Sequence, residues 1–289
     1  MPKVLTQQQV EQFERDNFLA PIGVLSEDEA RHYRSCLERY EAEQGGAPLN
    51  PALSRKIHVR EPWAAELVRH PRLLDAIEDL IGPDILVYST TLFTKEAGGI
   101  QVTGWHQDAT YLGLDPYEHI NVWVALSNAS EEAGCMRFVV SSSRLGQLRH
   151  GAQNMPGSVN HGGQAIVETV PLEQVQSAPL EIGQLSFHHT LAVHSSEPNR
   201  SNDRRIGFSV SVIPTYVRHT GSYRMGATLV RGEDKYGHFD LEPDPREHDA
   251  GTNAGNYTAC YARYRQGYEE QIARHLQAQE KNQAELRAG

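Results

Sequence analysis

The feature that most constrains the fold is a series of short apolar segments after residue 84, with no helix-like segment between them. Each segment is rich in β-branched and aromatic residues and is bounded by glycine, proline, asparagine or serine, as β-strands typically are. Many short strands without intervening helices favour an antiparallel sandwich or jelly roll over alternating β-α-β units. The predicted strands cover residues 85–95, 121–127, 137–141, 165–170, 185–193 and 205–214.

The first 83 residues carry helix-start signals instead. Thr6 is followed three positions later by Gln9, and Ser26 by Glu29, and each pair can form a capping box. A third helix is predicted over residues 71–81, because a Gly-Pro pair follows it and would end it. This part of the chain is therefore expected to be mainly helical.

Beyond the predicted strands, the chain has a polar segment and then a helix. Residues 216–250 are rich in glycine, proline and charged residues and are predicted to form an ordered loop, whereas residues 257–288 have the charged, amphipathic pattern of a helix. No internal repeat or abrupt change in composition divides the chain. We therefore expect one domain over residues 1–289, made of a helical part (1–83), a jelly-roll core (84–215) and a loop with a C-terminal helix (216–289).

Composition narrows the range of partners and compartments. A formal net charge of -10 and a pI near 5.8 argue against nucleic acid or an anionic membrane as a partner. The sequence shows no signal-peptide pattern and no apolar run of membrane-spanning length. Cys36, Cys135 and Cys260 have no metal-ligand spacing and fit a reducing compartment. The sequence predicts a soluble, cytoplasmic protein, and it does not indicate an oligomeric state.

The segment Gly104-Trp-His-Gln-Asp108 carries the first candidate metal ligands. Alternate residues of a strand point to the same side, so His106 and Asp108 can converge on one ion. Two histidines and one carboxylate form the facial triad of non-haem iron sites, which leaves positions open for a co-substrate and dioxygen. An H-x-D pair alone is weak evidence, because it arises often by chance.

A histidine cluster about ninety residues further on can supply the third ligand. The segment Phe187-His-His-Thr-Leu-Ala-Val-His194-Ser-Ser196 contains three candidates, His188, His189 and His194. We favour His194, because the polar residues after it end its strand, and metal ligands in such barrels lie at strand ends. His189 is expected to pack or hydrogen-bond nearby.

Two arginines at the start of the last predicted strand are candidates for binding a dicarboxylate. When 2-oxoglutarate chelates iron through its keto-acid end, its far carboxylate points into the protein. A guanidinium can bind that carboxylate through two parallel hydrogen bonds, whereas burying it unpaired would be costly. Strand alternation sends Arg204 and Arg205 to opposite faces, so only one of them can take this role.

These motifs occur together with Trp123, the Gly134-Cys-Met136 turn and the segment His194-Ser-Ser-Glu-Pro-Asn199. In this combination, and with residues 5–19 at the N-terminus, the chain resembles the phytanoyl-CoA dioxygenase family. The resemblance implies a mainly β fold with flanking helices, a double-stranded β-helix (jelly roll) of the cupin kind. It also implies a set of site residues: Fe(II) bound by His106, Asp108 and His194, the 2-oxoglutarate carboxylate held by Arg205, and the co-substrate pocket lined by Trp123 and Ser196.

The same resemblance implies an oxygenase that converts 2-oxoglutarate and O2 to succinate and CO2 while it hydroxylates a small-molecule or natural-product substrate, with secondary metabolism as the expected setting. Desaturation, epoxidation and cyclisation remain alternatives, because they depend on how the substrate is placed. Two other classes also remain. A non-oxidative cupin-type metalloenzyme would not need Arg205, and a jelly-roll binding protein would not need the metal ligands.

Overall fold

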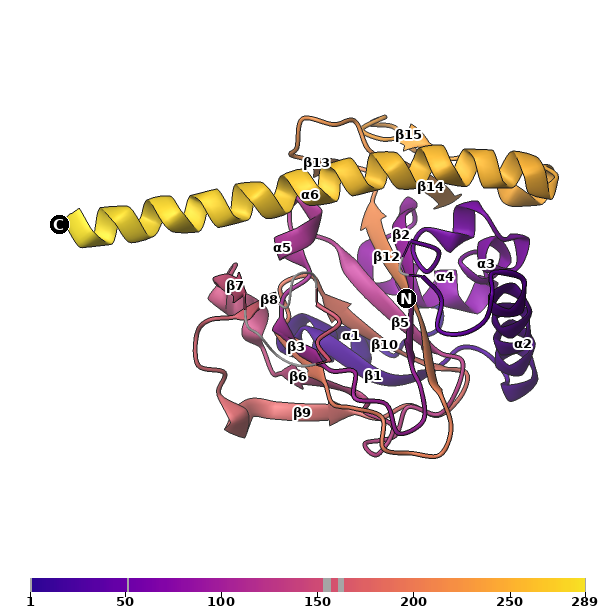
Figure 1. Ribbon diagram of the computed structural model, residues 1–289, viewed down its shortest axis with the longest axis horizontal. Coiled ribbons are helices and arrows are strands. Elements are labelled where there is room, and N and C mark those ends of the chain that lie inside the picture. The colour runs from indigo at the N-terminus through magenta and orange to yellow at the C-terminus, as the bar shows by residue number, and fades with distance from the viewer. Residues whose placement is uncertain (1, 51, 153–156, 161–163, 289) are drawn as a thin grey trace.

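The computed structural model describes residues 2–50, 52–152, 157–160 and 164–288. Strands form the core and helices flank it (Figure 1). The helices are α1 (Gln7–Asp16), α2 (Glu27–Glu43), α3 (Pro62–Leu67), α4 (Pro71–Ile81), α5 (Ala109–Leu112) and α6 (Ala250–Ala288). The strands are β1 (Phe18–Gly23), β2 (Ile85–Lys95), β3 (Thr103–His106), β4 (Leu114–Asp115), β5 (Ile120–Ala125), β6 (Met136–Val139), β7 (His150–Ala152), β8 (Gln164–Ile166), β9 (Val175–Ala178), β10 (Gln184–His189), β11 (His194–Ser196), β12 (Arg205–Pro214), β13 (Arg218–His219), β14 (Gly226–Arg231) and β15 (Asp240–Leu241).

Two sheets make up the jelly roll. The larger sheet has seven strands in the order β1-β10-β5-β12-β2-β14-β15, and the smaller has four in the order β3-β11-β6-β9. Pairing within them is antiparallel, except at the short edge pair β14–β15. Neighbouring strands are often far apart in the chain, as in a double-stranded β-helix. The fold class predicted from the sequence is confirmed.

The two faces of the larger sheet differ in chemistry. Along β12, Phe208 and Val210 join a hydrophobic core that also includes residues of α2, α3 and α4. Ser209 and Ser211, the alternate residues of the same strand, line a cavity on the opposite face. Full burial of a large apolar side chain contributes about 1.5–3 kcal/mol. The apolar face therefore fixes the sheet on its helices and leaves the polar face free to form a site.

Both predicted capping boxes are formed, and α4 has its predicted bounds. Thr6 Oγ1 accepts a hydrogen bond from the amide of Gln9 at 3.2 Å, and Ser26 Oγ accepts one from the amide of Glu29 at 3.3 Å. Strand β1 was not predicted. It follows α1 through Asn17, which takes a left-handed conformation with φ 66°, and it pairs with β10 at the edge of the larger sheet.

The predicted loop over residues 216–250 is partly wrong. It contains β14, which joins the larger sheet beside β2, and β15, which pairs with β14. The apolar stretch of β14 is short and lies among polar residues, so its strand conformation depends on pairing with β2 rather than on a pattern of its own. Helix α6 also begins at Ala250, earlier than the predicted residue 257.

Helix α6 lies across one end of the jelly roll, and its C-terminal part extends beyond the body of the molecule (Figure 1). It contacts α5 and the short 3-10 turn Ile57–Val59. Helix α6 and the segment around Ile57–Val59, which are far apart in the sequence, therefore lie side by side at this end of the jelly roll. In the part of the chain that the structure describes, no helix has both the length and the apolar character needed to cross a membrane.

Candidate active site

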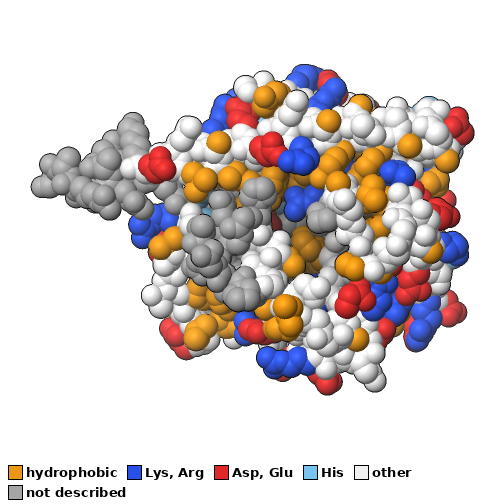
Figure 2. All heavy atoms as spheres, in the orientation of Figure 1, with side chains coloured by type: hydrophobic (Ala, Val, Ile, Leu, Met, Phe, Trp, Pro, Cys, Tyr) orange, Lys and Arg blue, Asp and Glu red, His pale blue; other side chains and the backbone are white. Residues whose placement is uncertain are grey.

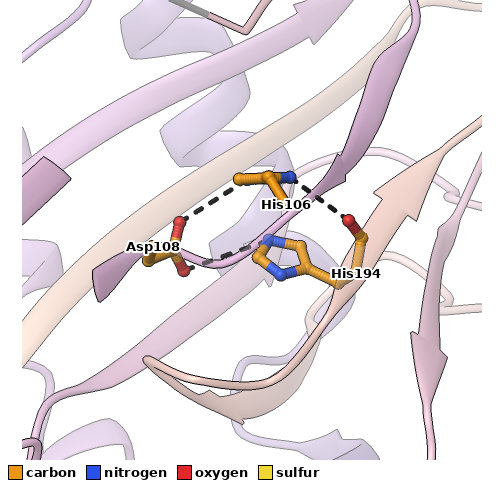
Figure 3. Close-up of side chains that lie close together, drawn as sticks. All are labelled: His106, Asp108 and His194. Atoms are coloured by element: carbon orange, nitrogen blue, oxygen red, sulfur yellow. Dashed lines mark hydrogen bonds and ion pairs between the residues drawn. The ribbon is translucent and has the colours of Figure 1, made fainter. Parts of the chain in front are cut away.

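The three predicted metal ligands lie together between the two sheets. His106 ends β3 and pairs with His194, the first residue of β11, while Asp108 lies two residues beyond β3, at the start of α5 (Figure 3). Asp108 Oδ1 is 3.6 Å from His106 Nε2, and Asp108 Oδ2 is 3.9 Å from His194 Nε2. One ligand atom from each residue lies within 4.8 Å of the others, a spacing that can hold one metal ion.

Backbone carbonyls fix the orientation of both imidazoles. His106 Nδ1 lies 2.9 Å from Gly104 O, and His194 Nδ1 lies 3.0 Å from Ala192 O. A carbonyl can only accept, so each Nδ1 carries the proton and each Nε2 keeps a lone pair. Both lone pairs are therefore available to a metal, as is usual for histidine ligands whose second nitrogen is hydrogen-bonded.

Asp108 is held through one of its two oxygens. Asn121 Nδ2 donates to Asp108 Oδ2 at 2.5 Å, and His188 Nε2 lies 3.1 Å from the same oxygen. Ser211 Oγ donates to Asn121 Oδ1 at 2.7 Å, which turns the Asn121 amide nitrogen toward Asp108. These contacts leave Asp108 Oδ1, the oxygen nearer His106, free to bind a metal.

The rival histidines take other positions. His188 is paired with Asn121 across β10 and β5, and it contacts Asp108 as a neighbour rather than as a member of the metal-binding group. His189 points elsewhere, and its Nδ1 accepts a hydrogen bond from the amide of Leu191 at 3.2 Å. This local hydrogen bond agrees with the expectation for His189.

Burial and charge give the ligands suitable protonation states. Burial alone would raise the pKa of Asp108, but the nearby His194, His106 and His188 hold that pKa well below its ordinary value. Burial and the neighbouring His106 lower the pKa of His194 well below its ordinary value. An ionised carboxylate beside a neutral imidazole is the form that binds a divalent metal.

Arg205 lies at the deep end of the same cavity. Its side chain is buried and stacks over the Trp123 ring at 5.1 Å, and its Nη1 donates to Gly134 O at 3.0 Å. Within the described residues its Nε has no hydrogen-bond partner, and no carboxylate forms an ion pair with it. Burial lowers the pKa of Arg205 to about 10. A buried guanidinium without an anion is costly unless a ligand supplies one.

A second buried basic side chain lies beside Arg205. Lys95, at the end of β2, donates through Nζ to Ser196 Oγ at 2.6 Å and to Glu197 O at 2.5 Å. Burial, together with the positive charge of Arg205, lowers the pKa of Lys95 to about 6. Ser196 Oγ also donates to Thr103 at 3.0 Å, so Ser196 connects Lys95 to β3. The sequence interpretation missed Lys95.

The position of Trp123 depends on a glycine in the neighbouring strand. A Cβ atom added at Gly207 would lie 1.8 Å from the Trp123 ring, so only glycine allows the indole to lie against β12. Gly207 follows Arg205 by two residues and therefore faces the same side. A glycine inside a long, otherwise bulky strand often marks such a close approach, and this signal could have identified Gly207 from the sequence.

Arg204 points away from the cavity, as strand alternation predicts. Its guanidinium forms an ion pair with Glu41 at 2.7 Å and with Glu96 at 2.9 Å. These two carboxylates already satisfy its charge, so the geometry favours Arg205 over Arg204 as the residue available to a ligand.

The cavity opens toward α6, where the sequence interpretation placed no site residue. Arg55, Tyr111, Tyr264 and Tyr268 line this end together with His106 and Asp108. In the space-filling view, the surface below α6 is hollowed, with basic and hydrophobic side chains around the hollow (Figure 2). The residues come from three distant segments, so no local pattern could have grouped them.

Residues 9–207 match the model of the family Phytanoyl-CoA dioxygenase (PhyH). The phytanoyl-CoA dioxygenase domain-containing protein 1 homolog of Caenorhabditis elegans is 30% identical over 135 residues, which cover 44% of this chain and 46% of the relative. The phytanoyl-CoA dioxygenase domain-containing protein 1 of Mus musculus is 26% identical over 170 residues, or 56% of each chain. The chain thus spans about half the length of these curated relatives.

Solved structures match over more of the chain. The apo form of ThoJ, a non-heme monooxygenase, is 32% identical with a TM-score of 0.81, and the match covers 92% of this chain and 99% of ThoJ. The ThoJ-Ni complex is 31% identical with a TM-score of 0.75, and the match covers 91% and 100%. CytC3 with Fe(II) and alpha-ketoglutarate is 22% identical with a TM-score of 0.62 over 85% of this chain and 96% of CytC3, and it shares the fold.

Proposed function

This chain belongs to the phytanoyl-CoA dioxygenase family, and on that premise we propose that it is an Fe(II)- and 2-oxoglutarate-dependent oxygenase that hydroxylates a small-molecule substrate. The observation that carries the proposal is the pairing, in one cavity, of a His-Asp-His group with a buried arginine that lacks an anionic partner among the described residues. A metal alone would explain only the first of these features.

The donor set fits iron. His106, Asp108 and His194 would hold the ion, since two imidazole nitrogens and one carboxylate oxygen converge from one side. Asn121 and His188 would keep Asp108 oriented through its second oxygen. Such outer contacts set the direction of a ligand and raise metal affinity.

The deep end of the cavity fits the dicarboxylate co-substrate. Arg205 would bind its far carboxylate, with Trp123 holding the guanidinium from one side. Lys95, which is held by its hydrogen bond to the Ser196 hydroxyl, would add a second positive charge when the co-substrate is bound. Burial and the charge of Arg205 disfavour the charged form of Lys95, and an anionic ligand between them and the metal site would favour it.

The bound iron would couple oxidative decarboxylation of 2-oxoglutarate, which gives succinate and CO2, to oxidation of the substrate by O2. The chain's own residues would fix both partners. Arg205 and the strands around it would orient the co-substrate, and the tyrosines of α5 and α6 would cover the substrate and exclude water. Hydroxylation is the reaction we propose, and the similarity to ThoJ, described as a non-heme monooxygenase, supports it over desaturation, epoxidation or cyclisation.

Two other classes explain the site less well. A cupin-type metalloenzyme with Zn or Mn would use the same ligands, but it would have no need for a buried, unpaired Arg205. A binding protein would have no need for two histidines with fixed tautomers around one carboxylate. A small-molecule substrate and O2 are the partners that we propose, and a role in secondary metabolism remains a prediction.

The test is an anaerobic titration of the Fe(II)-loaded protein with 2-oxoglutarate, following the visible charge-transfer band of a chelated keto acid. We expect a band in the wild type, and we expect Arg205→Ala to need at least ten times more 2-oxoglutarate for half of its intensity. Arg205→Lys should lie between them, because it keeps the charge but loses the two-point contact. Arg204→Lys is the matched control and should behave as the wild type.

Absence of the band in the wild type would contradict the oxygenase proposal and would favour a cupin-type metalloenzyme or a binding protein. A band that forms equally well in Arg205→Ala would keep the oxygenase and move the carboxylate anchor to another residue.

A further inference from the structure

We propose that Arg55 binds a carboxylate of the substrate at the mouth of the cavity, so that the substrate is an organic acid with an apolar or aromatic body. This inference rests on the proposed function, because it uses the same cavity. It goes further in naming the class of substrate and the residue that recognises it.

Arg55 is held in place by its backbone. It forms an isolated bridge with Thr91 of β2, and its carbonyl accepts a hydrogen bond from the Tyr257 hydroxyl of α6 at 3.0 Å. The next residue, Lys56, is fully buried and forms an ion pair with Glu242 at 2.6 Å. The segment that carries the side chain is therefore rigid, and the guanidinium lines the cavity that contains His106 and Asp108.

The charge of Arg55 is not neutralised within the described part of the chain. No carboxylate there forms an ion pair with it, and its neighbours are the tyrosines of α6. Arg204 and Arg231, by contrast, each contact two carboxylates. Arg205 also lacks a carboxylate partner in this cavity, but in the proposed function it binds the co-substrate. Among the described residues that line this part of the cavity, Arg55 is thus the cation available to a substrate.

Aromatic contacts lead from Arg55 toward the metal ligands. Its guanidinium lies 5.2 Å from the centre of the Tyr268 ring, and Tyr268 stacks on Tyr111 at 5.6 Å with an angle of 14°. Tyr111 in turn lies 6.4 Å from the His106 ring. Tyr268 both lies against the guanidinium and hydrogen-bonds to it. A guanidinium has five N–H donors, so others remain for a planar anion. A carboxylate on those donors would lay the rest of the substrate along the tyrosines toward His106.

A carboxylate fits better than a phosphate. One guanidinium matches one carboxylate through two parallel hydrogen bonds and equal charge. A phosphate dianion would keep one charge uncompensated, in a cavity that also contains the ionised Asp108. Lys95 does not line the part of the cavity that contains Arg55, His106 and Asp108, although it and Arg55 both border a neighbouring hollow.

The alternative is that Arg55 only fastens α6 to the body of the protein. Arg60 provides the matched control for this role. It stacks over Tyr257 of the same helix at 5.4 Å and over Tyr40 at 5.5 Å, but it pairs with Glu61 and does not line the cavity. The variants Arg55→Met and Arg60→Met both keep a long apolar side chain. Each removes one positive charge that lies over a tyrosine ring of α6.

The experiment screens matched small molecules by thermal shift against the Fe(II)-loaded protein with excess 2-oxoglutarate under anaerobic conditions. Each scaffold is present as a carboxylic acid, a primary amide and a phosphate monoester. In the wild type and in Arg60→Met, we expect the acids to be enriched among stabilising compounds. In Arg55→Met this enrichment should disappear, and calorimetry of the best acid should show Kd at least ten times higher, with the Kd of its amide unchanged.

Several outcomes would overturn the proposal while leaving the oxygenase intact. These are no preference for acids in the wild type, an equal preference in Arg55→Met, loss of the preference in Arg60→Met, or a stronger preference for phosphates. A higher 2-oxoglutarate requirement for the charge-transfer band in Arg55→Met would assign Arg55 to the co-substrate instead. Failure of the proposed function itself is recognised separately, because it removes that band from the wild type.

Discussion

The two ends of the cavity are built in different ways. The deep end is made by strands β2, β3, β5, β11 and β12, whose registers place His106 opposite His194 and bring Trp123 against Gly207. The mouth is made by Arg55, α5 and α6, which come from distant parts of the chain and meet through stacked rings. Strand pairing fixes the first group residue by residue, whereas the second is held mainly by side-chain packing, together with single contacts such as the bridge of Arg55 with Thr91.

Because the two ends are built differently, substitutions at the deep end and at the mouth should have different effects. A change at the deep end should alter the binding of metal or 2-oxoglutarate, because Asp108 and Lys95 are hydrogen-bonded to other residues of the site and Arg205 stacks on Trp123. A change at the mouth should leave both ligands bound and alter only the substrate, as proposed for Arg55. If the deep end behaves as one unit, substitutions at its separate residues should all weaken metal or 2-oxoglutarate binding.

The largest effect is expected for Asp108→Ala. The variant loses the carboxylate ligand, so Fe(II) affinity should fall by more than the 10–100-fold that is typical for loss of an outer contact. Metal binding is measured by calorimetry with Fe(II) under anaerobic conditions. Asp115→Ala, an exposed aspartate paired with Arg218, is the control. Normal iron binding in Asp108→Ala would remove the facial-triad assignment.

Gly207→Ala should come next, and it tests whether a residue without a side chain is part of the site. The added Cβ would overlap the Trp123 ring at 1.8 Å, so the ring must leave its position under Arg205. Overpacking of this kind costs about 1–3 kcal/mol. We expect a lower Tm and roughly tenfold weaker 2-oxoglutarate binding, on the scale of about 1.4 kcal/mol for each factor of ten.

Gly23→Ala is the control for this substitution, because nothing lies within 4 Å of its added Cβ. In the double variant Gly207→Ala, Trp123→Leu, stability should recover while 2-oxoglutarate binding remains weak. Unchanged co-substrate binding in Gly207→Ala would show that the Trp123 stack does not position Arg205.

An intermediate effect is expected for His188→Ala. His188 contacts Asp108 Oδ2 at 3.1 Å and belongs to its support rather than to the metal-binding group. Loss of such a partner typically weakens metal binding about 10–100-fold. The adjacent His189→Ala should leave Fe(II) affinity as in the wild type. If His188→Ala removed iron as completely as His194→Ala does, His188 would be a ligand and the deep end would need a new assignment.

The features that the sequence predicts depend on local backbone geometry, and most of those that it misses depend on contacts between distant segments. Strand alternation was enough to separate Arg204 from Arg205, because that inference needs only the local backbone. Capping boxes at Thr6 and Ser26 were equally local. The H-x-D spacing grouped His106 with Asp108, but the strand ends at His106 and Asp108 caps α5, so strand alternation is not what brings these two side chains together. Strand β14 and the tyrosines of α6 were missed, because their roles arise from packing against segments that lie far away in the chain.

The smallest predicted effect concerns proton uptake at the deep end. Burial and the charge of Arg205 lower the pKa of Lys95 to about 6, so its side chain is mostly neutral at pH 7.5. A bound dicarboxylate favours the charged form and raises this pKa, so binding of 2-oxoglutarate should take up a fraction of a proton at pH 7.5. Below pH 6 the uptake should fade, because Lys95 is then already protonated in the free protein.

Calorimetry in two buffers with different ionisation enthalpies measures this uptake directly, and Lys95→Met should remove it. Arg55→Met should not change it, because Arg55 belongs to the mouth and the proton is exchanged at the deep end. Equal uptake in Lys95→Met would assign the proton to another group. Loss of the uptake in Arg55→Met would show that the two ends are coupled electrostatically, and the division between them would then hold for their construction but not for their charge.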